Sequence, residues 1–174
     1  MRKKSEFGIL GGSFDPPHKG HVKISNISLK NFGFKKVYWV IAKKNPLKKR
    51  PLFSFKERLR MCRAINKKNS KIKVLNLEKK IKSSKTIDLI NYLTKVKKFK
   101  NLYFIIGSDN LINFHKWTKW KKIVKYSKLI VFSRKGYDKR GRNSIVVKYL
   151  NKKNIIFVKN SFINISSSSI RKKV

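Results

Sequence analysis

The chain has 174 residues, of which 40% are hydrophobic, which is enough for one domain with a substantial core. Its 47 lysine and arginine residues against 7 acidic ones give a formal net charge of +40. The single cysteine, Cys62, excludes an internal disulfide, and no apolar run approaches the roughly 18 residues of a membrane span. We therefore expect a single cytoplasmic domain over residues 1–174, with no membrane segment.

The high positive charge favours either a nucleic-acid-binding protein or a bias in composition. Lysine outnumbers arginine, the basic residues are scattered along the chain, and they form no basic tail. The bias is therefore the better interpretation, and we expect no specific nucleic-acid partner. The field would still attract polyanions and cause weak, salt-sensitive adhesion to nucleic acid.

The first patterned stretch predicts a strand, a tight loop and the start of a helix. An apolar run over 7–10 ends on Gly11 and Gly12, where the missing side chains let the backbone turn and a ligand come close. His18 and His21 follow at a spacing of three, so both can lie on one face of the first helical turn. The N–H groups at a helix start bind anions, so this stretch predicts a phosphate site.

Strand and helix patterns alternate along the rest of the chain. We expect five further strands, at 37–41, 72–75, 102–106, 129–132 and 155–158. We expect helices at 21–32, from 55 to about 65, at 86–96, from about 120 with Trp120 in the core, at 145–150, and after a serine cap at 166–169. The segments 42–52, 76–85 and 137–143 are expected to be loops. The fold class is α/β, a Rossmann-like doubly wound parallel sheet of about five to six strands with helices on both faces.

The segment GGSFDPPHKGH, residues 11–21, resembles the signature of the nucleotidyltransferases that carry the H-x-G-H motif. Members of this superfamily join a phosphate or phosphonucleotide to a nucleoside triphosphate and release pyrophosphate. The block from Gly107 through Trp117 and Trp120 to Arg134 resembles bacterial nicotinate-nucleotide adenylyltransferases, with Lys135 in place of a usual proline. This resemblance implies transfer of AMP from ATP to nicotinate mononucleotide, forming deamido-NAD in NAD biosynthesis.

The resemblance also assigns roles to individual residues. Those expected around the triphosphate, as the catalytic groups, are His18, His21, Lys48 and Arg171. Those expected to bind the nucleotide are Gly11, Gly12, Ser13, Phe14, Gly107, Asp109, Arg134, Ser167 and Ser168. Thr86 and Trp117 are expected beside the nicotinate ring, since a flat apolar face can stack on a heteroaromatic ring. Lys85 replaces the aromatic residue that usually precedes Thr86, and His115 is expected at the surface.

Magnesium is the expected cofactor, held mainly by ATP phosphates, without a metal site made by the protein. Two alternatives remain from the sequence. A sister adenylyltransferase would use nicotinamide mononucleotide or phosphopantetheine as acceptor, although relatives that use phosphopantetheine usually have threonine at the position of His18. A basic RNA- or DNA-binding protein on the same scaffold is the other alternative, and the intact motifs argue against it. The sequence does not determine the oligomeric state.

Overall fold

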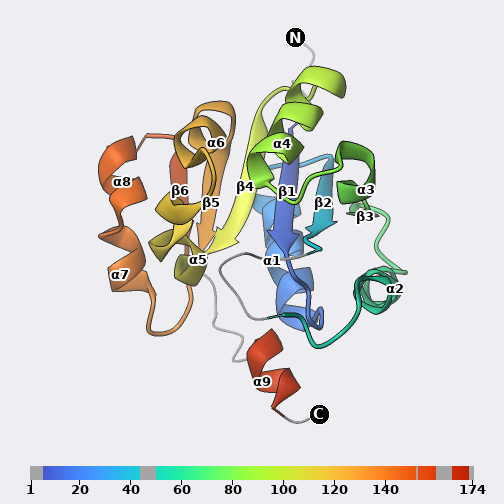
Figure 1. Cartoon of the computed structure of the whole chain (residues 1–174). Helices are drawn as coiled ribbons and strands as arrows, with labels where there is room; N and C mark the ends of the chain where they lie inside the picture. The colour runs from blue at the N-terminus through green and yellow to red at the C-terminus, as the bar shows by residue number, and fades with distance from the viewer. Residues whose placement is uncertain (1–5, 44–49, 152, 160–165, 173–174) are drawn as a thin grey trace. The chain divides into compact units, whose positions relative to one another are not determined.

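The computed structural model describes residues 6–43, 50–151, 153–159 and 166–172 (Figure 1). The chain divides into two compact units. We call residues 7–84 with 163–174 the N-terminal unit, and residues 85–162 with 1–6 the central unit.

The N-terminal unit contains three parallel strands, β1 (Phe7–Gly12), β2 (Lys36–Ile41) and β3 (Ile72–Leu75). β2 pairs with β1 on one side and with β3 on the other, and Leu10 lies opposite Trp39 in the first pair. β-branched and aromatic residues dominate β2, as suits a strand that is covered on both faces. Trp39 has no exposed surface, and its indole N–H donates to the Ser25 hydroxyl at 2.8 Å.

Three helices of this unit begin at residues whose side chains cap them. His18 caps α1 (Lys19–Asn31), Ser54 caps α2 (Phe55–Ile65) and Ser166 caps α9 (Ser167–Arg171). The Ser54–Glu57 capping box expected from the sequence is present, with Ser54 N–H donating to Glu57 at 2.8 Å. A cap satisfies N–H groups that the helix itself leaves unpaired, so these residues determine where each helix starts.

The central unit contains β4 (Leu102–Gly107), β5 (Lys128–Phe132) and β6 (Ile155–Val158), which also pair in parallel. All residues of β4 except the terminal glycine are buried. Its helical segments are α4 (Thr86–Asn91), a π-helical turn (Tyr92–Val96), α5 (Ser108–Ile112), a 3₁₀ turn (Phe114–Lys116), α6 (Trp120–Tyr126), α7 (Asp138–Arg142) and α8 (Ile145–Leu150). Strand and helix therefore alternate in this unit as they do in the other.

The strand order is β3-β2-β1-β4-β5-β6, and helices flank the strands. This is the order of the doubly wound Rossmann-type sheet, so the expected fold class is confirmed, with six strands. Among the helices that the structure describes, none combines the length and the apolar character needed to cross a membrane. The expected cellular location stays a prediction.

Two segments that were predicted to be loops are short helices, and Trp120 is not in the core. Within 76–85, residues Glu78–Ile81 form α3, and within 137–143 residues Asp138–Arg142 form α7. Gly141 explains the second difference, because its N–H donates to the Tyr137 carbonyl at 2.8 Å and its bare Cα packs on Ser108. Trp120 is half-buried, and its ring meets Tyr149 edge-on with centroids 5.0 Å apart.

Cys62 lies on the inner face of α2 with no exposed surface. Burial raises the pKa of its thiol to about 12, although the nearby Arg58 acts in the opposite direction. We therefore expect no reaction of the native protein with Ellman's reagent at pH 8, because the thiolate is the reactive form. One equivalent should react once urea unfolds the chain, and rapid labelling before unfolding would contradict the buried position.

Candidate active site

The two histidines of the H-x-G-H motif cap the start of α1 reciprocally. Gly20 N–H donates to His18 Nδ1 at 3.1 Å, and His18 N–H donates to His21 Nδ1 at 3.2 Å. Because both Nδ1 atoms accept hydrogen bonds, each neutral ring carries its proton on Nε2. The ring centroids are 3.9 Å apart, which agrees with the shared helix face predicted from the spacing of three residues. Both rings therefore lie beside the positive end of a thirteen-residue helix, with Nε2–H as the donor group of each neutral ring.

Aromatic packing behind His21 fixes the position of its ring. Phe14 stacks on Trp39 with centroids 4.8 Å apart and also lies 4.8 Å from the His21 ring. On the helix side, the Ser25 hydroxyl receives the Trp39 indole N–H and donates to the His21 carbonyl. Phe14 adopts a left-handed backbone conformation with φ of 48°, and a Cβ added to Gly12 would lie at van der Waals distance from the Phe14 ring. Phe14, one of the expected nucleotide-binding residues after β1, thus packs directly against His21.

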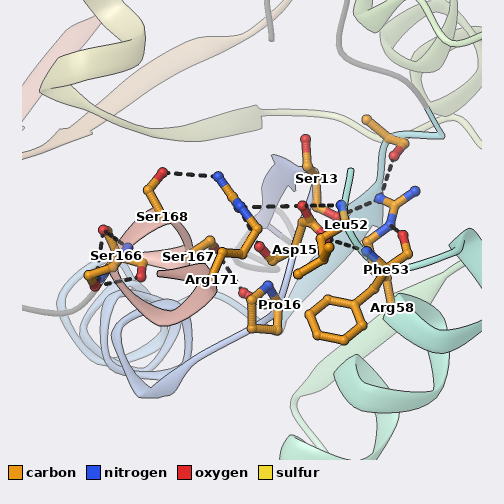
Figure 2. A network of polar contacts seen from close by, with 12 residues as sticks. Ser13, Asp15, Pro16, Leu52, Phe53, Arg58, Ser166, Ser167, Ser168 and Arg171 are labelled. Atoms are coloured by element: carbon orange, nitrogen blue, oxygen red, sulfur yellow. Dashed lines mark hydrogen bonds and ion pairs between the residues drawn. The ribbon is translucent and has the colours of Figure 1, made fainter. Parts of the chain in front are cut away.

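A second polar network connects the same loop to α9 and to the segment before α2 (Figure 2). The Ser167 hydroxyl donates to the Pro16 carbonyl at 2.8 Å, and Arg171 Nη1 donates to the Asp15 carbonyl at 2.5 Å. Arg171 Nη2 donates to the Ser168 hydroxyl at 3.1 Å. The structure therefore brings Ser167, Ser168 and Arg171 to the loop that ends at His18. Lys48 lies outside the described residues.

Arg58 is a buried member of this network that sequence reasoning missed. The residue is only 2% exposed, and its guanidinium donates to the carbonyls of Ser13, Ala42, Lys43 and Phe53 at 2.6–3.2 Å. It thereby joins the ends of β1 and β2 to the residues before α2. An arginine on a helix with basic neighbours is normally solvated, so the sequence carries no signal of this role.

In the central unit, the expected nucleotide residues gather where β4 and β5 end. Arg134 Nη1 donates to Asp109 Oδ2 at 2.6 Å, and the other carboxylate oxygen, Oδ1, is buried with no hydrogen-bond partner in the part of the chain that the structure describes. A Cβ on Gly107 would collide with that oxygen, so glycine is needed for this placement of Asp109. The structure thus brings together three residues that were expected to bind the nucleotide, Gly107, Asp109 and Arg134, in one charged cluster.

Asp138, which sequence reasoning did not single out, holds the backbone of Arg134. Its Oδ1 accepts the Arg134 N–H at 2.9 Å, and the Ser108 hydroxyl accepts the same N–H at 3.0 Å. Burial raises the pKa of Asp138, but hydrogen bonds from Ser108, the Arg134 backbone and Ser133 outweigh burial and leave the pKa below its usual value. The carboxylate therefore stays ionised at neutral pH and fixes the loop after β5.

Trp117 lies between the 3₁₀ turn and α6, and is half-buried. Its ring stacks on Phe114 with centroids 4.7 Å apart and meets Phe104 edge-on at 6.0 Å. Thr86 is the first residue of α4 and is also half-buried. His115 is not simply a surface residue, because its Nδ1 is buried without a hydrogen-bond partner in the described structure. The sequence offered no partner from which this burial could be inferred.

The fold, the capped histidine pair and the serine–arginine helix define a nucleotidyltransferase, and the family described as cytidylyltransferase-like matches residues 9–173. A Pelagibacter ubique protein named "Probable nicotinate-nucleotide adenylyltransferase" is 48% identical over 171 residues, which cover 98% of this chain and 94% of that relative. A protein of the same name from Fusobacterium nucleatum is 37% identical, covering 97% of this chain and 87% of the relative. The chain therefore belongs to the nicotinate-nucleotide adenylyltransferases within the cytidylyltransferase-like family.

Solved structures agree with this assignment. The Plasmodium falciparum nicotinic acid mononucleotide adenylyltransferase complexed with NaAD is 26% identical, with a TM-score of 0.76 over 97% of this chain and 83% of the other. The same enzyme complexed with APC gives a TM-score of 0.75 at 26% identity, again over 97% of this chain and 83% of the other.

Proposed function

We propose that this chain transfers the adenylyl group of ATP to nicotinate mononucleotide, forming deamido-NAD and pyrophosphate. The observation that carries this proposal is the reciprocally capped pair His18 and His21, which shares one unit with Ser167, Ser168 and Arg171. These groups are hydrogen-bond donors and a cation, which are the groups that a triphosphate requires. The names of the relatives supply the acceptor, since each refers to nicotinate nucleotide or nicotinic acid mononucleotide.

In the proposed reaction, an oxygen of the acceptor phosphate attacks the α-phosphorus of ATP in line. The bond from the α-phosphorus to the bridging oxygen breaks, and that oxygen leaves with pyrophosphate. The acceptor is already anionic, so the protein needs no base, and its work is positioning and charge stabilisation. We assign the Nε2–H groups of His18 and His21, together with Arg171 and Lys48, to the triphosphate. The loop residues Gly11 to Phe14 allow its close approach.

The remaining assignments concern the central unit. We propose that Gly107, Asp109 and Arg134 contact the nucleotide, because the buried, unpartnered Oδ1 of Asp109 is an acceptor suited to a ligand N–H or O–H. Trp117 and Thr86 would contact the nicotinate ring. We further propose that residues 1–174 act as one nucleotidyltransferase domain, because the cytidylyltransferase-like family matches residues 9–173, which include most of both units.

Magnesium is proposed as the cofactor, and its donors would be mainly phosphate oxygens. The described residues hold no group of three or more His, Cys, Asp or Glu side chains arranged to bind a metal ion. Asp15, the carboxylate in the loop, already accepts two backbone N–H groups and pairs with Arg171. When bound, Mg²⁺ would neutralise charge on the leaving pyrophosphate.

An acceptor assay tests this function directly. The purified protein with ATP and Mg²⁺ is given nicotinate mononucleotide, nicotinamide mononucleotide or phosphopantetheine, and pyrophosphate release is measured. We expect the highest kcat/KM with nicotinate mononucleotide. Equal or faster turnover of phosphopantetheine would overturn the proposed acceptor. No release with any acceptor, together with sequence-selective nucleic-acid binding at physiological salt, would favour the binding-protein alternative.

A further inference from the structure

Asp15 is a buried carboxylate whose two oxygens are both engaged. The residue is 4% exposed, its Oδ1 accepts the Phe53 N–H and its Oδ2 accepts the Leu52 N–H, each at 2.9 Å. Oδ2 also lies 3.3 Å from Arg171 Nη1 (Figure 2). A carboxylate is expensive to bury without such partners, so these hydrogen bonds offset the cost of burial and hold the carboxylate in one orientation.

Arg171 is oriented by Asp15 but not enclosed by it. Nη1 donates to both the carbonyl and the carboxylate of Asp15, and Nη2 donates to Ser168. A guanidinium has five N–H groups, so its Nε–H and one Nη2–H have no acceptor within the described part of the chain. The side chain is 34% exposed. One part of the guanidinium is thus fixed, while other donors remain for an anion.

The helix that carries Arg171 depends on these contacts for its position. α9 has only five residues, and a helix of that length is not stable in isolation. The side-chain hydrogen bonds that join it to the rest of the described chain run from Ser167 to the Pro16 carbonyl and from Arg171 to Asp15. Both acceptors lie within three residues of His18, so Asp15 connects the position of Arg171 to that of the histidine pair.

We propose that Asp15 is a positioning residue that holds the Arg171 guanidinium ready for the phosphates of ATP. This inference rests on the proposed function, in which Arg171 contacts the triphosphate. It adds that the affinity contributed by Arg171 depends on the Asp15 carboxylate. The competing role is a structural one, in which Asp15 serves only the backbone of Leu52 and Phe53.

A double-mutant cycle separates these two roles. The dissociation constant of ATP is measured by calorimetry, without acceptor, for the wild type, Asp15→Asn, Arg171→Ala and the double variant. We expect each single substitution to weaken ATP binding about tenfold, which corresponds to the loss of one charge-assisted hydrogen bond. The double variant should bind ATP within about twofold of Arg171→Ala, because residues that act through one interaction are not additive. If Asp15→Asn weakened ATP binding by the same factor in the wild type and in the Arg171→Ala variant, the two effects would be additive and the positioning role would be overturned.

Glu57→Gln is the matched control. Glu57 also accepts a backbone N–H, from Ser54 at 2.8 Å, but it lies at the exposed start of α2. Its substitution should leave ATP affinity within about twofold of the wild type while costing about as much stability as a lost cap. An equal loss of ATP affinity in Glu57→Gln would show a general effect of removing a capping carboxylate, and would overturn the proposal.

A measurement on the wild type avoids dependence on the folding of Asp15→Asn. In protein labelled with ¹⁵N-arginine, the Nε–H signal of Arg171, assigned by its loss in Arg171→Lys, should show restricted motion before ATP is added. A freely rotating guanidinium would overturn the proposal. Because ATP binding is measured without acceptor, a failure of pyrophosphate release with nicotinate mononucleotide would count against the proposed function alone. A wild type with no affinity for ATP would overturn both.

Discussion

Replacing His18 with alanine is expected to lower kcat with ATP and nicotinate mononucleotide about 100-fold or more, by analogy with the loss of one transition-state donor. The substitution removes the Nε2–H donor of His18. Because Nδ1 accepts the Gly20 N–H, the neutral ring carries its proton on Nε2. If this contact strengthens only as charge develops on the phosphates, KM for ATP should change little. Steady-state kinetics of pyrophosphate release measure both parameters. An unchanged kcat would remove His18 from the mechanism.

The cap that His18 provides must be separated from its chemical role. Asparagine is a favourable N-cap residue, so His18→Asn should keep much of the stability of α1 while still lacking the Nε2 donor. Ser54→Ala gives the opposite case, since it removes the cap of α2 without touching the histidine pair. For His18→Asn we expect a low kcat with near-normal stability. For Ser54→Ala we expect a near-normal kcat and a free energy of unfolding that is lower by about 1 kcal/mol.

Replacing Trp39 with alanine is expected to reduce the free energy of unfolding by about 3–5 kcal/mol, the usual cost of emptying a buried aromatic site. Trp39 is fully buried, stacks on Phe14 and donates to Ser25. That loss is a large part of the stability of an ordinary domain, about 5–15 kcal/mol. Urea unfolding, followed by circular dichroism, gives the value. A loss below about 1 kcal/mol would contradict the packing.

Two further tryptophan variants make this test specific. Trp39→Phe keeps a ring against Phe14 but removes the indole N–H, so its stability should fall less than that of Trp39→Ala, and the position of His21 should be only slightly disturbed. Trp120→Ala removes a half-buried ring that contacts Tyr149 in the central unit. We expect it to cost about 1 kcal/mol, near the centre of the distribution for point mutations, and to leave kcat unchanged.

The elements were predictable where local patterns are strong. The apolar runs of β2 and β4, the Ser54–Glu57 capping box and the serine cap of α9 all specify their structures through neighbouring residues. The segments that form α3 and α7 have no apolar period, and they were therefore assigned to loops. α7 forms because Gly141 packs on Ser108, which lies more than thirty residues earlier in the chain. Such a contact is invisible to a reading of local pattern.

The candidate site also contains some contacts that the sequence predicted and others that it did not. The spacing of His18 and His21 implied a shared face, and the structure shows their rings 3.9 Å apart. Asp15 lies in the signature segment 11–21. Nothing nearby in the sequence indicates that its carboxylate accepts hydrogen bonds from Leu52, Phe53 and Arg171. Arg58 looks like a solvated helix residue until its burial is known.

The sequence by itself predicted an α/β fold of about five to six strands and a phosphate-binding helix start, and its motifs resemble those of nicotinate-nucleotide adenylyltransferases. The predicted fold and helix start follow from short-range patterns, because capping, strand formation and helix periodicity act between residues a few positions apart. Only the tertiary structure decided how the site is held together. Arg171 is joined to Asp15 across 156 positions and Arg58 to Ser13 across 45, and contacts over such separations exist only after the chain has folded.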